Sequence, residues 1–188
     1  QVANVRFANR FEFDFDSPVQ LCCPENNRGH GWFMRTSGDW RSRPVVILIH
    51  GWNAQLHYEM LLPRLARRLR RMGINSLAFE LPLHSQRRPG KEHPVGDFIS
   101  DEVPTMLGAT RQALADIHAL LLWAKKEGCP KVACWGFSLG GWLSGLYGTV
   151  TNSADALVLT TPVTSMSEAI RDLPFCHPIR ETLKVAPF

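Results

Sequence analysis

"CWGFSLGGW", residues 134–142, places a serine between two glycines at the junction of two apolar runs. The run "KVACWGF" before it is expected to be a strand, and "LGGWLSGLYGTV" after it a helix. A strand that passes directly into a helix through Gly-x-Ser-x-Gly needs a tight turn, which strains Ser138 and requires small residues at Gly136 and Gly140. The pattern predicts that the Ser138 hydroxyl is a nucleophile at the carboxyl edge of a sheet, beside the backbone N–H of Leu139. A serine that only caps the helix is the structural alternative.

A second signal, "HGWNA" at residues 50–54, follows the first continuous apolar run of the chain. Gly51 lets the chain bend back so that the backbone N–H of Trp52 can point toward the serine. Together with Leu139, Trp52 would then form an oxyanion hole that stabilises developing negative charge. His50 is expected to orient this loop and not to react. The alternative is a glycine-containing loop whose histidine supports a turn.

From Arg43 onward, short apolar runs alternate with longer amphipathic ones, which predicts an α/β fold: a mostly parallel sheet with helices on both faces. The predicted strands are residues 44–51, 74–82, 131–137 and 155–162, and the predicted helices are residues 57–72, 104–127 and 139–150.

The segment before Arg43 has a different pattern. "RFEFDFDSP" alternates phenylalanine with charge, as a half-exposed strand does, and "GHGWFMRTSG" is its expected hairpin partner. We therefore expect one domain over residues 1–188, with antiparallel N-terminal strands in 1–42, a parallel core in 43–162 and the start of a lid or cap in 163–188.

Three segments resemble the α/β-hydrolase superfamily of serine esterases and lipase-like enzymes: "VVILIHGWN", "LAFELPLHSQRRPG" and "VACWGFSLGG". The resemblance spans about residues 44–162. In the middle segment the chain has Glu80 where the family motif has aspartate, and Ser85 where it has glycine. The resemblance implies that His84 stabilises a loop near the pocket, and the alternative is that Glu80, Pro82 and His84 are ordinary loop anchors. We expect no cofactor and no metal ion.

A serine nucleophile needs a base held by an acid, and the family order is serine, acid, histidine. After Ser138 the only histidine is His177, and Asp172 lies close to it in sequence. A triad of Ser138, Asp172 and His177 is formally possible. The favoured hypothesis is that the chain is truncated, so that the last strands of the sheet, the acid and the base belong to a missing C-terminal segment.

Composition sets broad limits. The chain has 188 residues, of which 45% are hydrophobic and 20% charged, as in a globular domain. Its net charge of +4 owes much to "RLARRLRRMG", whose arginines are expected on the solvated face of an amphipathic helix, with an anionic partner as the alternative. Five cysteines without metal-ligand spacing and the lack of a long apolar stretch argue against a disulfide framework and a membrane span. A cytoplasmic protein is expected, and export stays open because the chain begins at Gln1.

The predicted function is hydrolysis of a carboxylic ester through an acyl-enzyme on Ser138. The flanking rings of Trp52, Phe137 and Trp142 favour an uncharged acyl or aryl group in a small-molecule substrate, although Phe137 and Trp142 can equally fill the core. The same turn also serves thioesterases and peptidases, so the sequence does not distinguish hydrolysis of a thioester or a peptide from hydrolysis of an ester.

Other readings remain. In the loop after the second strand, Arg87, Arg88 and Lys91 either meet an anionic substrate or are simply solvated. A non-catalytic binding protein of the same fold is the alternative function. Nucleic-acid binding ranks last, so no nucleic acid is expected as a partner, and the sequence does not define the oligomeric state.

Overall fold

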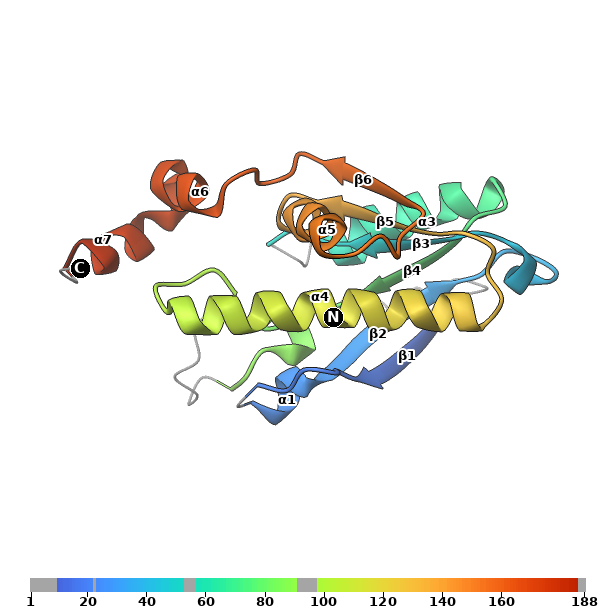
Figure 1. The fold of residues 1–188 in the computed structure, drawn as a ribbon, viewed down its shortest axis with the longest axis horizontal. Helices are drawn as coiled ribbons and strands as arrows, with labels where there is room; N and C mark the ends of the chain where they lie inside the picture. The colour runs from blue at the N-terminus through green and yellow to red at the C-terminus, as the bar shows by residue number, and fades with distance from the viewer. Residues whose placement is uncertain (1–9, 22, 53–56, 91–97, 186–188) are drawn as a thin grey trace.

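The computed structural model describes residues 10–21, 23–52, 57–90 and 98–185. Its centre is a six-stranded sheet in the order β1-β2-β4-β3-β5-β6 (Figure 1). The strands are β1 (Arg10–Asp16), β2 (Arg28–Met34), β3 (Val45–Ile49), β4 (Asn75–Phe79), β5 (Val132–Phe137) and β6 (Ala156–Thr160). The last four run parallel, whereas β1 pairs with β2, and β2 with β4, in antiparallel fashion. The predicted parallel core with an antiparallel N-terminal edge is confirmed.

Helices cover both faces of this sheet, as the sequence pattern predicts. Alternate residues of β3 enter two separate apolar clusters: Ile47 packs beneath α4 (Val103–Lys126) and α5 (Leu139–Val150), and Leu48 packs beneath α3 (Leu62–Arg71). Strands buried on both faces carry nearly continuous apolar sequence, which explains the run "VVILI". Figure 1 shows α4 lying along one face of the sheet.

The arginine-rich helix α3 has the expected solvated face, where Arg64, Arg68 and Arg71 are exposed. Its apolar face buries Leu62, Ala66 and Leu69. The helix ends at Arg71, one residue before the predicted end at residue 72, and Met72 is 66% exposed. Gly73 follows with a φ of +77°, a left-handed conformation that glycine adopts without strain at helix ends.

The remaining elements are short. They are α1 (Pro24–Asn27), a π-helical turn (His57–Leu61), α6 (Met166–Asp172), α7 (His177–Val185) and 3₁₀ turns at Trp40–Ser42, Ser85–Arg87 and Pro174–Cys176. In Figure 1, α6 and α7 extend away from the sheet beyond the carboxyl end of β6. None of the helices described in the structure is long and apolar enough to cross a membrane.

Candidate active site

The turn between β5 and α5 has the strained geometry that its glycines predict. Ser138 has φ 51° and ψ −114°, which is a left-handed φ that non-glycine residues rarely adopt. A Cβ at Gly136 would overlap the carbonyl group of Gly140, and a Cβ at Gly140 would overlap the carbonyl groups of Ile49 and His50. The two glycines therefore let β5, α5 and the end of β3 approach closely enough to form the turn.

Ser138 lies half-buried in the wall of a pocket of about 930 Å³. Among the described residues, no hydrogen-bond partner is found for its hydroxyl. Leu139 is the first residue of α5, so its N–H has no partner within the helix, and the helix dipole adds positive potential at this end. A pocket-lining serine beside a helix N-terminus is the arrangement that a serine nucleophile requires.

The loop after β3 passes directly beside this serine. A Cβ at Gly51 would lie 3.2 Å from the Cβ of Ser138 and 2.9 Å from the Nδ1 and Cε1 atoms of His57. The backbone N–H of Gly51 donates to Nδ1 of His57 at 3.2 Å. His57 also lines the pocket, and no motif in the sequence pointed to it, because its position depends on how the chain turns after Trp52.

His50 contacts the carbonyl group of the same residue, Gly51. Its Nδ1 lies 2.7 Å from the carbonyl oxygen of Gly51, and its Nε2 accepts the backbone N–H of Leu81 at 3.0 Å. These partners require a neutral ring with its proton on Nδ1. Burial, with a smaller contribution from the charge of His84, lowers the pKa of His50 to about 3. His50 thus links the loops after β3 and β4, which agrees with the orienting role predicted from the sequence.

His84 occupies the loop after β4 and holds the next residue of the β3 loop. Its Nδ1 lies 2.8 Å from the carbonyl oxygen of Pro82, and its Nε2 lies 2.9 Å from the carbonyl oxygen of Trp52. The ring is almost completely buried and also lines the pocket. Nearby, Glu80 accepts hydrogen bonds from the backbone and side-chain N–H groups of Gln86, and burial raises its pKa.

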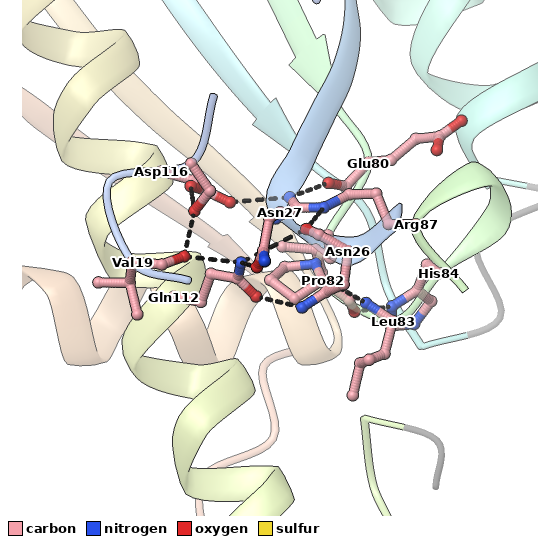
Figure 2. Close-up of polar contacts among 12 residues, drawn as sticks. Val19, Asn26, Asn27, Glu80, Pro82, Leu83, His84, Arg87, Gln112 and Asp116 are labelled. Atoms are coloured by element: carbon pink, nitrogen blue, oxygen red, sulfur yellow. Dashed lines mark hydrogen bonds and ion pairs between the residues drawn. The ribbon is translucent and has the colours of Figure 1, made fainter. Parts of the chain in front are cut away.

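A buried polar network anchors the His84 loop (Figure 2). The Arg87 side chain, which is fully buried, donates from Nη1 to Asp116 on α4 at 2.7 Å and to the carbonyl oxygen of Glu80 at 2.9 Å. Its Nε donates to the carbonyl oxygen of Asn26 at 2.9 Å. Burial raises the pKa of Asp116, and the Arg87 guanidinium opposes this shift. The prediction that Arg87 meets a substrate or is solvated is wrong, because it is paired in the interior.

The other two basic residues of that loop have different positions. Arg88 is exposed and lines the pocket, whereas Lys91 lies outside the described residues. Of the three aromatic residues expected at the rim, Trp52 lines the pocket. Phe137 stacks on Trp135 with ring centroids 5.9 Å apart, and Trp142 packs against the main core, so both serve the interior.

The pocket wall is mostly apolar and comes from four parts of the chain, which follow β3, β4, β5 and β6. The lining residues after β4 include Leu83, Phe98 and Ile99, and those after β6 include Val163, Met166, Ile170 and Leu173. Polar groups gather at His57, Glu59, Ser85 and Arg88. The segment predicted to begin a lid or cap therefore supplies one wall of the pocket that contains Ser138.

Asp172 and His177 are not brought to this pocket. Both carboxylate oxygens of Asp172 accept hydrogen bonds from Arg171, at 2.8 and 3.1 Å, and this neighbour lowers the pKa of Asp172. His177 is exposed at the start of α7. Neither is among the described residues that line the pocket. Their use as acid and base stays a prediction without support from their positions.

Candidate metal ligands and the core thiol of Cys134 lie in the described part of the chain. Within it, no group of three histidine, cysteine or acidic side chains could hold a metal ion. Cys134 is buried in the core as expected, and burial raises its pKa to about 12, so its thiol stays protonated.

The fold and the strained serine turn together define the class of protein. The chain belongs to the alpha/beta hydrolase family, whose model matches residues 46–186. The resemblance noted in the sequence is thereby confirmed.

Individual similar proteins are known from both sequence and structure. The uncharacterized protein Rv2627c of Mycobacterium tuberculosis H37Rv is 28% identical over 167 residues, which cover 86% of this chain and 39% of that protein. The Pyrococcus furiosus esterase Pf2001 superposes with a TM-score of 0.61 at 19% identity, over 95% of this chain and 60% of the esterase. The alpha/beta hydrolase GrgF of Penicillium sp. sh18 gives 0.60 at 18% identity, over 93% and 52%. The chain thus spans well under two thirds of the length of each.

Proposed function

We propose that this protein is a serine hydrolase that cleaves a carboxylic ester through an acyl-enzyme on Ser138. The observation that carries the proposal is the strained turn at Ser138, which places this half-buried serine in the wall of a pocket beside a helix N-terminus. Membership of a hydrolase family and the likeness of the fold to a Pyrococcus furiosus esterase support the reaction class.

The proposed oxyanion hole consists of the backbone N–H groups of Trp52 and Leu139. Support comes from the close passage of Gly51 beside Ser138 and from the position of Leu139 as the first residue of α5. In enzymes of this type, one such donor lowers the reaction barrier by about 3 kcal/mol, because it meets charge that develops only in the transition state.

The proposed substrate is a small ester with an apolar acyl or aryl group. The pocket volume of about 930 Å³ suits a small molecule, and Leu83, Phe98, Met166 and Ile170 offer apolar contact. No strong positive or negative surface dominates the wall, where the charges of Glu59 and Arg88 have opposite sign.

We place the catalytic acid and histidine in a part of the whole protein outside this chain. Support comes from the comparison with Pf2001, of which this chain covers 60%, and from the exposed positions of Asp172 and His177. Serine hydrolases that lose triad partners retain only a small part of their rate, so this chain alone is expected to react slowly.

A fluorophosphonate probe tests the proposal in the full-length protein. Peptide mapping is expected to find the adduct on Ser138, and Ser138→Ala is expected to abolish labelling. Ser167→Ala is a matched control, because Ser167 is an exposed serine on the nearby helix α6. Full-length protein that takes up no label at Ser138 would contradict the proposal and favour a non-catalytic binding protein of the same fold.

A further inference from the structure

Three histidines surround the peptide that contains the proposed Trp52 donor. His50 contacts the carbonyl oxygen of Gly51, His57 accepts the N–H of Gly51, and His84 contacts the carbonyl oxygen of Trp52. Every hydrogen bond just named goes to a backbone atom of Gly51 or Trp52. The Trp52 N–H lies in the same peptide plane as the Gly51 carbonyl group that His50 contacts, and His57 and His84 contact the peptides on either side of that plane.

The partners of each ring determine its protons. His50 has one carbonyl oxygen and one N–H as partners, so it is neutral with a proton on Nδ1. His84 differs, because its two ring nitrogens lie 2.8 and 2.9 Å from the carbonyl oxygens of Pro82 and Trp52, which only accept. A neutral imidazole has one N–H and would set a nitrogen lone pair against one of these oxygens.

We infer that His84 is an imidazolium whose Nδ1–H and Nε2–H clamp the Pro82 and Trp52 carbonyl groups, and that this clamp positions the Trp52 N–H for the reaction at Ser138. His84 is thus a positioning residue. The catalytic part of the inference rests on the proposed function, but the protonation state does not.

The loop is built to hold this ring in place. Leu83 and Ser85, on either side of His84, have φ values of 60° and 49°, a strained backbone that surrounding structure must maintain. The N–H of Leu83 donates to Oδ1 of Asn26 at 2.9 Å, and Arg87 ties the end of the loop to α4 (Figure 2). The buried network therefore stabilises the conformation of this loop, and the loop conformation orients the His84 ring.

The charged surroundings are compatible with a cation at this position. The ring of His50 lies 5.0 Å away between centroids and is neutral, so it does not repel the charge. In the part of this loop that the structure describes, the other titratable groups are Glu80, Arg87 and Arg88. The Glu80 carboxyl group accepts from Gln86, Asp116 neutralises Arg87, and Arg88 is exposed. Across the pocket, the turn before α3 contributes His57, Tyr58 and Glu59.

Nitrogen-15 NMR of the imidazole rings in the full-length protein tests the protonation state directly. At pH 7 we expect both nitrogens of His84 to carry protons, while His50 shows protonated Nδ1 and bare Nε2. A His84 ring with a single proton at pH 7 would overturn the inference, whether or not Ser138 reacts. A failure of the proposed function is therefore distinguishable from a failure of this inference.

Two variants test positioning. In His84→Gln the side-chain amide can still reach the Trp52 carbonyl, whereas in His84→Asn the shorter amide reaches only the position of Nδ1. We expect His84→Asn to slow fluorophosphonate labelling of Ser138 at least about tenfold more than His84→Gln, because a displaced donor loses transition-state stabilisation. The labelling rate of the wild-type protein should also fall at alkaline pH, as His84 loses a proton, and His84→Gln should lack that fall. Equal labelling rates in variants of equal melting temperature would overturn the positioning role.

Discussion

Single residues determine the chemistry of this molecule, and the most constrained of them is Ser138. Its strain arises from steric contacts within a few residues, because Gly136 and Gly140 permit a turn that other residues would block. Local sequence is therefore sufficient to predict it. The contacts of His84 with Trp52, 32 residues apart, and of Arg87 with Asp116, 29 residues apart, have no such local signal.

The first prediction concerns acid stability and His50. Its pKa in the folded protein is about 3, below the ordinary value of 6.5, so the folded state resists protonation. Its contribution to the free energy of unfolding is complete above about pH 6.5 and is lost as the pH falls toward 3, and its full size is on the order of 5 kcal/mol. In His50→Asn, which can donate to Gly51 but does not titrate, urea unfolding should show a shallower loss of stability over this range. Parallel pH profiles for the two proteins would contradict the assignment.

Three elements of secondary structure, β3, β5 and α5, approach each other closely at the glycines of the serine turn. The glycine pattern predicted this junction correctly, because a missing Cβ is visible in the sequence. The ends of α3 and α4 were equally predictable, since Gly73 and Gly128 adopt positive φ after each helix. The burial of Arg87 was not predictable, because the sequence of a polar loop does not indicate that one of its charged residues pairs with Asp116 in the interior.

Glycine-to-alanine substitutions test the junction of β5 and α5. Gly136→Ala should lower the free energy of unfolding by at least about 2 kcal/mol, because its Cβ would overlap the Gly140 carbonyl group. Gly145→Ala is the control on the same helix, where the nearest atom to a new Cβ, in Leu159, is at an ordinary 3.6 Å. That change should be neutral or stabilise by up to about 1 kcal/mol, since alanine favours helix. Similar losses of stability in both variants, measured by urea unfolding, would contradict the steric account.

At the scale of the whole molecule, the sheet described here ends in an apolar edge. Leu157, Val158 and Leu159 of β6 are 37%, 41% and 43% exposed, although residues of a parallel strand are usually buried. The sequence predicted the strand but not its exposure, because burial depends on what packs beside it.

Edge strands with exposed apolar side chains favour association with other chains. We therefore predict that this chain self-associates as its concentration rises, and that Val158→Lys suppresses the association. Val150→Lys serves as the control, because Val150 is 65% exposed and is the last residue of α5, so it is not part of the edge strand. Sedimentation velocity measures the effect, and a wild-type chain that remains monomeric at every concentration would show that the edge is not adhesive.

The central claim is that backbone N–H groups in the loop after β3 and at the start of α5 together stabilise the negative charge that develops during the reaction at Ser138. A crystal structure of the full-length protein with a phosphonate bound to Ser138 tests it most directly. The account predicts that the phosphoryl oxygen accepts hydrogen bonds from the backbone N–H groups of both Trp52 and Leu139, at about 2.7–3.1 Å. A phosphoryl oxygen that points into solvent, away from both N–H groups, would contradict the account.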